Sequence, residues 1–272
     1  EYAGKEDVYD FTVDKWHNFA ANGIFVHNCF TVSPDDTMES IMQVAYDAAM
    51  IEKYGGGIGF GFSKLRPEGD KISTTQKNSC GPIAVMKLYG KVGDTLTQGA
   101  FRMGAHMGQM SILHPDIQAF LHCKDDDWTL KNFNISVQVT DEFMKAVEEK
   151  KDWSFVNPRT KKITKTVKAV DLMKEICESS WKTGDPGIVF IDRVNETHPN
   201  PSLGPIETSN PCGEQYLENY GNCDLGSIDI SKFVEDKQIN REKLGIAIDI
   251  SIRFLDDVID VNQFPVEKLR EI

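Results

Sequence analysis

The feature that most constrains the fold is a change of pattern at Asn28-Cys29, near the start of a chain of 272 residues. Before this junction, residues 1–28 contain only short runs suited to strands and turns. After it, amphipathic stretches with helical spacing alternate with short strand-like runs. Such alternation is typical of a parallel sheet covered by helices. The pattern therefore predicts an α/β domain over residues 29–272, preceded by a separate β segment.

Local signals place the individual elements of this domain. Capping-box spacing from Asp36 to Glu39 predicts the start of a helix whose apolar side carries Met38, Ile41, Met42, Ala45, Ala48 and Ala49. We expect this helix to end at Gly55-Gly56-Gly57 and a strand to follow over residues 58–62. Further helices are expected at 83–97, 115–123, 141–150, 169–183 and 241–262, and strands at 106–113, 132–139 and 187–191.

Composition excludes several classes of protein. With 40% hydrophobic and 26% charged residues, the chain has the composition of a globular protein with a sizeable core. No apolar run approaches the roughly 18–20 residues that span a bilayer, and no signal-peptide pattern opens the chain, so we expect a cytoplasmic protein without a membrane partner. A net charge of −12 argues against direct nucleic-acid binding. It leaves a nucleotide substrate possible, because that needs only local phosphate-binding groups.

The cysteines and histidines do not form a metal-binding pattern. No Cys-x-x-Cys pair or His/Cys cluster is present, so we predict no metal site. Each cysteine is then either a buried apolar residue or a chemical one. We expect Cys80, Cys123 and Cys177 to be buried or incidental, and His106, His114, His122 and His198 to be structural.

The sharpest motif is Asn210-Pro211-Cys212-Gly213-Glu214. Proline favours an extended Asn210 and Gly213 permits a tight backbone, so the motif predicts a loop. A thiol, a carboxylate and an amide presented together suit hydrogen-atom abstraction coupled to proton transfer. Cys223 follows soon after, and a turn between them would bring the two cysteines together. From these residues alone, a structural turn that merely contains two cysteines is an equal alternative.

A glycine-rich stretch at positions 55, 56, 57, 59 and 61 invites a nucleotide-binding interpretation. Its spacing matches neither the Gly-x-Gly-x-x-Gly fingerprint nor the phosphate-binding Gly-x-x-x-x-Gly-Lys loop. We interpret these glycines instead as a strand against which other backbone packs closely.

Several stretches of the second segment match one enzyme family in order. They are Cys29-Phe30 with Met38-Glu39, GGGIGFGFS (55–63), Leu65-Arg66-Pro67, His114-Pro115-Asp116-Ile117, NFNISV (132–137), VTDEFM (139–144), NPCGE (210–214) and Cys223-x-Leu225-Gly226-Ser227. Residues 29–272 thus resemble the catalytic chain of ribonucleotide reductase. The proline in NPCGE is typical of class II, the adenosylcobalamin-dependent branch. The resemblance implies a ten-stranded α/β barrel, of which this chain holds about the first half and the active-site loop.

The resemblance also implies a thiyl-radical mechanism that reduces a ribonucleotide. Cys212 would carry the radical, Glu214 would be the general base, and Asn210 would hold the sugar. Cys29 and Cys223 would form the reducing dithiol, regenerated by an external thiol such as thioredoxin. Gly57 would lie where the backbone approaches the substrate.

Regulation by a deoxynucleotide effector is implied as well. Asp36, Lys53 and Arg66 match effector-binding positions of the family, and the stretch from Gly99 to Ala105 matches its specificity loop. Phe101 and Met103 depart from the polar and basic residues usual in that loop. A homodimer is possible. The later strands, the remaining phosphate site and the carboxy-terminal cysteines are missing, so we expect this piece to be inactive alone.

The first segment resembles the carboxy-terminal end of an intein, with a short β segment of the Hint fold. The resemblance is carried by Val8–Val13, His17-Asn18-Phe19, Ala21-Asn22-Gly23 and the final His27-Asn28. It implies that Asn28 cyclises and cleaves the bond to Cys29, that His27 polarises the carbonyl, and that His17 with Asp10 assists proton movement. Cys29 would accept the upstream chain as a thiolate. The amino-terminal part of an intein would have to be supplied in trans. An ordinary hairpin with Asn22-Gly23 as its turn is the alternative.

Two other functions remain open at this stage. A class I reductase would take its radical from a partner subunit rather than from a cobalamin. A splicing precursor would have autoprocessing as its only activity of its own.

Overall fold

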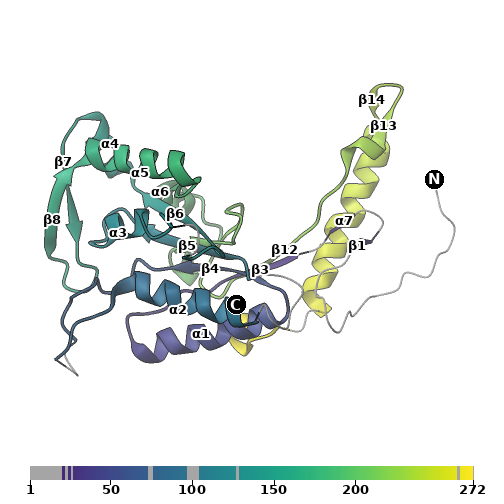
Figure 1. The fold of residues 1–272 in the computed structure, drawn as a ribbon. Helices are drawn as coiled ribbons and strands as arrows, with labels where there is room; N and C mark the ends of the chain where they lie inside the picture. The colour runs from purple at the N-terminus through teal and green to yellow at the C-terminus, as the bar shows by residue number, and fades with distance from the viewer. Residues whose placement is uncertain are drawn as a thin grey trace. The chain divides into compact units, whose positions relative to one another are not determined.

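The structure is a computed structural model that describes residues 20–21, 24–25, 27–72, 76–96, 104–126, 129–261 and 264–271. Contacts within the chain divide it into two compact units. The larger unit comprises residues 29–222 and 264–272, and the smaller one comprises residues 1–28 and 223–263. Figure 1 traces both units along the chain.

Parallel strands form the centre of the larger unit. Neighbouring strands follow the order β3 (His27–Thr31), β4 (Gly57–Gly61), β5 (His106–Ser111), β6 (Phe133–Val139) and β9 (Gly187–Phe190). Each pair is parallel, with Cys29 opposite Gly57, Ile58 opposite His106, and Ser136 opposite both Gln109 and Gly187. Since parallel neighbours need crossover connections, helices lie between most of these strands (Figure 1). The predicted α/β class and its parallel sheet are confirmed.

Helix α1 (Met38–Lys53) begins one residue later than the capping signal suggested. Its N-cap is Thr37, whose side chain accepts a hydrogen bond from the Ser40 backbone N–H at 3.1 Å. Asp36 does not cap the helix because its carboxylate pairs with Arg66. The predicted apolar side is also partly wrong. Met38 and Met42 are exposed, and the buried face carries Val44, Ala45, Asp47, Ala48, Ile51 and Glu52.

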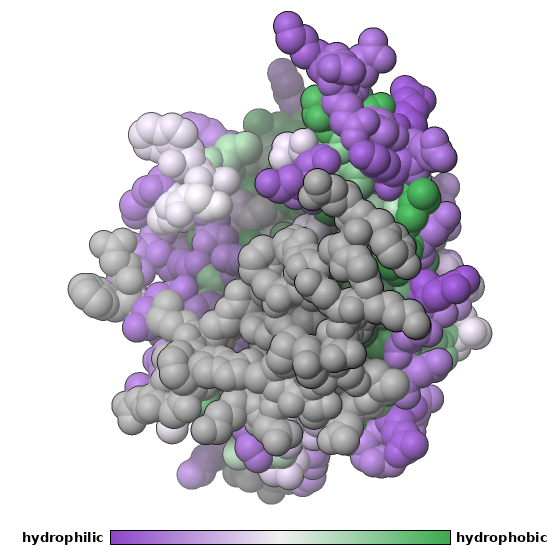
Figure 2. All heavy atoms as spheres, turned by 90° about the vertical axis from the view of Figure 1, so that its right-hand side faces the viewer, coloured by the Kyte–Doolittle hydropathy of each residue, from purple (hydrophilic) through white to green (hydrophobic). Residues whose placement is uncertain are grey.

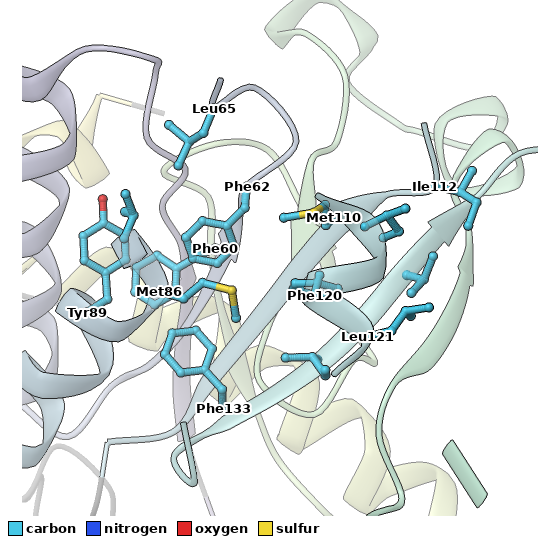
Figure 3. Packing of buried hydrophobic residues seen from close by; sticks show 14 of the residues in the cluster. Phe60, Phe62, Leu65, Met86, Tyr89, Met110, Ile112, Phe120, Leu121 and Phe133 are labelled. Atoms are coloured by element: carbon cyan, nitrogen blue, oxygen red, sulfur yellow. The ribbon is translucent and has the colours of Figure 1, made fainter. Parts of the chain in front are cut away.

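The core lies between the sheet and its helices. Phe60 of β4 and Phe62, which directly follows that strand, meet Met86 and Tyr89 of α2 (Gly81–Leu96) and Phe133 of β6, all fully buried (Figure 3). The ring centroid of Phe60 lies 5.0 Å from that of Tyr89 and 5.9 Å from that of Phe133. Such tilted aromatic pairs add to the free energy gained by burial. The core continues with Met110, Ile112, Phe120 and Leu121 (Figure 3).

Other elements of the larger unit were predicted with mixed success. The expected helices correspond to α2, α3 (Ile117–Leu121), α4 (Asp141–Glu148) and α5 (Ala169–Thr183). The antiparallel pair β7 (Asp152–Val156) and β8 (Ile163–Lys168), the helix α6 (Ile191–Glu196), and the short pair β10 (Thr208–Ser209) and β11 (Tyr216–Leu217) were not predicted. Single 3-10 turns span Pro201–Leu203 and Glu267–Arg270.

The smaller unit contains short strands and one long helix. Its elements are β1 (Ala20–Ala21), β2 (Ile24–Phe25), β12 (Asn222–Leu225), a 3-10 turn at Ile230–Phe233, β13 (Val234–Glu235), β14 (Gln238–Ile239) and α7 (Arg241–Val261). β1 pairs with β2 in an antiparallel hairpin, in which Ala21 lies opposite Ile24. Several isoleucine side chains of helix α7 are exposed. Figure 2 shows hydrophobic residues at the surface among hydrophilic ones. Within the described ranges, no helix is both long and apolar enough to cross a membrane.

Candidate active site

The two faces of the parallel sheet differ in chemistry. In β4, Ile58 and Phe60 point into the helix-covered core, while Gly57, Gly59 and Gly61 alternate with them. The same alternation places mostly small or polar residues opposite the core in and just after the neighbouring strands: Cys29, Thr31 and Ser33; Gln109 and Ser111; and Asn134, Ser136 and Gln138. Met107 of β5 is the apolar exception on this face. Strands of a parallel sheet are usually apolar on both faces. This second face is therefore adapted to hold something other than a hydrophobic core.

A polypeptide loop occupies that face and lies against the glycines of β4. A Cβ atom at Gly59 would lie 1.7 Å from the Ser209 carbonyl oxygen, and one at Gly61 would lie 2.9 Å from the Glu207 carbonyl oxygen. A Cβ at Gly57 would lie 2.8 Å from the Pro211 ring. Only glycine leaves room for backbone at this distance. The glycine-rich stretch thus permits close packing, as predicted, and its partner is the loop that precedes Cys212.

Asn210 organises the tip of this loop. Its side-chain Oδ1 accepts hydrogen bonds from the backbone N–H groups of Gly213 at 3.1 Å and Gln215 at 3.0 Å. Gly213 has φ +84°, the left-handed conformation that favours glycine. The Nδ2 atom of Asn210 is buried and has no hydrogen-bond partner among the described residues. Asn210 therefore shapes the turn with its side-chain oxygen, while its side-chain N–H donors make no hydrogen bond within the described residues.

Cys212 is exposed at the end of the loop, beside Glu214 and Cys29. Partial burial of its sulfur, followed by the Glu214 carboxylate and the Cys29 thiol, raises the pKa of Cys212 above its ordinary value. The thiol consequently stays protonated at neutral pH. This environment keeps the thiol protonated to a higher pH than in a free cysteine, and so disfavours the thiolate that nucleophilic attack requires.

Cys29 is half-buried on the face of the sheet that lies opposite the hydrophobic core, called the inner face from here on. The Cβ position of Gly57 lies 3.6 Å from the Cys29 sulfur, so Gly57, Pro211 and Cys29 meet at one point. Cys223 belongs to the smaller unit, and the pairing of Cys29 with Cys223 stays a prediction.

The predicted effector residues fall into two groups. The Arg66 Nε donates to both carboxylate oxygens of Asp36, at 3.0 and 2.8 Å, and the Arg66 backbone N–H donates to the same carboxylate. This hydrogen bonding raises the pKa of Arg66. Lys53 lies in the last turn of α1, with its ammonium 5.3 Å from the centre of the Tyr54 ring. The expected loop from Gly99 to Ala105 falls mostly outside the described residues.

Side chains that hold the loop were missed by the sequence analysis. Gln109 donates to the Ser209 hydroxyl at 2.8 Å, Gln138 donates to the Glu207 carbonyl at 2.6 Å, and Asn134 donates to the Pro211 carbonyl at 2.8 Å. The signal was present in the sequence. Asn134, Ser136 and Gln138 alternate with apolar residues in a strand that would otherwise be apolar on both faces.

The histidines expected to be structural have structural partners. His106 is fully buried and forms a short contact with Glu52, and His114 bonds to the Leu65 carbonyl oxygen at 2.8 Å. His122 contacts Glu175, and His198 contacts the Gly204 carbonyl oxygen. Among the residues that the structure describes, no group of His, Cys, Asp or Glu side chains is arranged to hold a metal ion.

The three other cysteines divide into one that packs against the core and two that are exposed. Burial raises the pKa of the Cys123 thiol to about 12, and this residue packs against the core as expected. Cys80 and Cys177 are exposed, so of the two expectations, burial or an incidental role, only the second remains for them.

The residues expected to take part in splicing are described only in part. Asp10 and His17 lie outside the described residues. The backbones of His27 and Asn28 open β3, and the hairpin of β1 and β2 precedes them. The residues of its turn, Asn22-Gly23, are also outside the described part of the chain.

Comparison with known proteins agrees with this geometry. Residues 27–271 match the model of the family described as "Ribonucleotide reductase, barrel domain". A vitamin B12-dependent ribonucleoside-diphosphate reductase of Thermoplasma acidophilum is 44% identical over 246 residues, which cover 90% of this chain and 32% of that protein. Its counterpart from Mycobacterium tuberculosis (strain CDC 1551) is 39% identical, covering 89% of this chain and 35% of that protein.

A more distant relative is a viral protein. The ribonucleoside-diphosphate reductase large subunit of Variola virus is 29% identical over 300 residues, which cover 96% of this chain and 39% of that protein. The chain thus spans about a third of the length of the curated relatives that it matches. From the family match and these identities, the chain belongs to the ribonucleotide reductase family and contains part of its barrel domain.

Proposed function

We propose that this chain contributes the radical-bearing half of an active site that reduces ribonucleotides to 2′-deoxyribonucleotides. The observation that carries the proposal is the loop from Glu207 to Glu214, held on the polar inner face of a parallel sheet with Cys212 at its tip. Cys29 and Glu214 lie beside the Cys212 thiol, as their effect on its pKa indicates. One face of the sheet packs against this single cysteine-bearing loop, and this arrangement supports Cys212 as the reacting residue.

The reaction starts from Cys212. Its thiyl radical removes the 3′ hydrogen of the ribose, which makes an S–H bond and leaves a carbon radical on the sugar. After the 2′ hydroxyl has left, Cys212 returns a hydrogen atom to the same carbon and regains its radical. The raised pKa of Cys212 supports this role, because the neutral thiol is the form that exchanges hydrogen atoms.

Glu214 and Asn210 serve the sugar in this proposal. Glu214 takes the proton of the 3′ hydroxyl, a role typically worth about 10²–10⁴-fold in rate. Asn210 donates a hydrogen bond to the sugar from its buried Nδ2, the atom that the turn leaves without a partner. Gly57 lies beside Cys29 at the edge of the same site.

Cys29 and Cys223 supply the two electrons. One thiol hydrogen leaves with the 2′ hydroxyl as water and the other ends on the 2′ carbon, while the two sulfurs close to a disulfide, so that atoms and charge balance. An external dithiol such as thioredoxin then reduces this disulfide for the next turnover.

The radical source that we propose is adenosylcobalamin, as in class II. When bound, it supplies a carbon radical by homolysis of its cobalt–carbon bond. Cys212 is the residue that would pass its hydrogen atom to that radical, and its exposure at the loop tip leaves the sulfur accessible. Pro211 in the motif supports class II. So does the greater similarity to relatives named B12-dependent than to the viral large subunit. The class I alternative is therefore not favoured.

Regulation and assembly follow from the same assignment. We propose that a deoxynucleotide effector binds near Asp36 and Arg66, with Lys53 contributing a charge to its phosphates. A homodimer and the remaining reductase segments complete the enzyme, which would act in the cytoplasm.

The first 28 residues support a second proposal, that this segment is the end of an intein. Asn28, His27, His17 and Asp10 would release Cys29 by cyclisation of Asn28, after Cys29 has accepted the upstream chain. Incubation with a matching amino-terminal intein piece should give a ligated product of the summed mass without the intein. If no such product forms, the trans-splicing proposal is wrong.

A substitution at Cys212 tests the reductase proposal. Cys212→Ser in a full-length reductase that carries residues 29–272 should abolish ribonucleotide reduction, because an alcohol O–H bond is too strong for this hydrogen exchange. Circular dichroism should be unchanged, since the residue is exposed. Activity of the unaltered enzyme should depend on added adenosylcobalamin. Turnover by the serine variant would refute the role of Cys212, and turnover without cobalamin would favour class I.

A further inference from the structure

Two buried glutamines on the inner face of the sheet have no role in the chemistry above. Gln109 of β5 is 0% exposed and Gln138 of β6 is 5% exposed. A buried amide costs free energy unless its hydrogen bonds are made. An apolar residue would have filled either position at no such cost. The presence of amide side chains at both buried positions therefore needs an explanation.

The glutamines form a chain of hydrogen bonds that leads to the loop. Gln138 Nε2 donates to Gln109 Oε1 at 3.0 Å and to the Glu207 carbonyl at 2.6 Å. Gln109 Nε2 donates to the Ser209 hydroxyl at 2.8 Å. That hydroxyl in turn donates to the Asn210 carbonyl at 3.1 Å. The chain of donors ends two residues before Cys212.

Contacts from the sheet recur along the loop with the period of a strand. Side chains of β5 and β6 hold Glu207, Ser209 and Pro211, the last through Asn134. The glycines of β4 lie on the same face of the sheet and pack against the same three residues. Because backbone packed this tightly cannot tilt without breaking hydrogen bonds, the amides set the direction in which the loop leaves the sheet.

We propose that Gln109 and Gln138 are positioning residues that fix the Cys212 thiol at its working place over the substrate sugar. The inference rests on the proposed function for the meaning of that place. It requires no contact between either glutamine and the substrate. Their action passes through Ser209 and the backbone of Asn210.

A double-mutant cycle tests the chain of hydrogen bonds. Gln109→Met keeps the volume of the side chain and removes the donor, and Ser209→Ala removes the acceptor. If the two groups act together, the double variant should lose little more kcat than either single variant.

Ser179→Ala is the matched control. Its hydroxyl is also buried and donates to a backbone carbonyl, that of Leu121 at 2.9 Å, but it lies in α5 and does not contact the loop.

The first measurement needs no turnover. In the 272-residue chain, alkylation of Cys212 by iodoacetamide is followed by peptide mass against pH. The sulfur of Cys212 is partly desolvated in the native loop, and a loosened loop would reduce that desolvation, so its pKa should fall toward the ordinary value. The alkylation rate at pH 8 should rise about tenfold for each unit of that fall. Ser179→Ala should leave the rate unchanged at similar thermal stability.

The second measurement is made in the full-length reductase. Gln109→Met should lower kcat by about 10²-fold, as expected for a small displacement of a reacting group. KM should change by no more than about threefold, since ground-state binding is untouched.

Unchanged alkylation and unchanged kcat in Gln109→Met would overturn the inference, as would an equal loss of kcat in Ser179→Ala. If alkylation changes as expected while the unaltered enzyme reduces no ribonucleotide, the positioning of Cys212 stands and the proposed function falls.

Discussion

At the residue scale, the glycines of β4 decide how close the Cys212 loop comes to the sheet. Gly59 is the extreme case, because its missing side chain is replaced by a carbonyl oxygen of the loop. The sequence predicts that something packs closely here, since the spacing excludes a phosphate loop. It does not predict what packs, because the partner residues lie far along the chain.

Gly59→Ala should displace the loop and destabilise the larger unit by about 3 kcal/mol or more, toward the upper range for overpacking. The clash is with backbone, which cannot rotate away as a side chain can. Thermal unfolding and proteolysis of the 205–215 segment would measure this. Gly245→Ala in α7, where nothing lies within 4 Å of the new Cβ, should instead stabilise its helix by up to about 1 kcal/mol. Equal effects of the two substitutions would contradict the packing argument.

Glu214→Gln should lower the pKa of Cys212, because it removes the largest of the charges that oppose thiolate formation. The pKa should remain above that of the same cysteine in urea, since burial is the larger cause. The pH profile of Cys212 alkylation, in the native and the unfolded chain, checks both statements. A native profile that coincides with the unfolded one would refute the raised pKa.

At the element scale, periodicity predicted most helices but not their caps. The beginning of α1 shows why: Asp36, Thr37 and Glu39 offer two overlapping capping patterns, and the choice depends on Arg66, a distant partner. The β7–β8 pair was missed for a similar reason. Its strand β8 is largely exposed, so it lacks the alternation that burial imposes.

Thr37→Ala should cost about 1 kcal/mol of stability, the usual value for a lost N-cap. The Ser40 N–H then loses its acceptor, while the Asp36–Arg66 pair remains. Denaturant unfolding would measure the loss. Thr95→Ala in α2 is the control, since the Thr95 hydroxyl only donates to the Lys91 carbonyl one turn back. A loss at Thr95 as large as that at Thr37 would argue against the cap.

At the scale of the whole molecule, the sequence indicated candidate reacting groups but not the side chains that hold them in place. Cys212, Glu214 and Asn210 form a local motif, so one stretch of sequence reveals them. Gln109 and Gln138 act on residues far away in the chain, and a single glutamine in a strand carries no sign of its partner. The Cys29–Cys223 pairing and the splicing residues stay predictions.

Global stability should fall at alkaline pH, partly through Cys123. Burial raises the pKa of its thiol to about 12 in the folded chain, against about 8.5 in an unfolded one. Below the unfolded value, both states keep the proton and the thiol does not affect the pH dependence. Above it, the unfolded state releases the proton first, so the free energy of unfolding falls as pH rises.

Cys123→Ala removes this term and loses some packing. Its deficit against the unaltered chain should therefore be largest at pH 7 and shrink by pH 10. Denaturant unfolding at both pH values measures the difference. A constant deficit would show that Cys123 does not titrate in this range.

The packing of the loop on the glycines of β4 also has a consequence for folding during synthesis. Gly61 leaves the ribosome long before Thr208, and at about 5–20 residues per second the wait is roughly 7 to 30 s. During that interval the inner face of the sheet has no occupant, and its strands can form only as an open surface. The loop that carries Cys212 therefore reaches the sheet only after all five of the parallel strands from β3 to β9 have been synthesised.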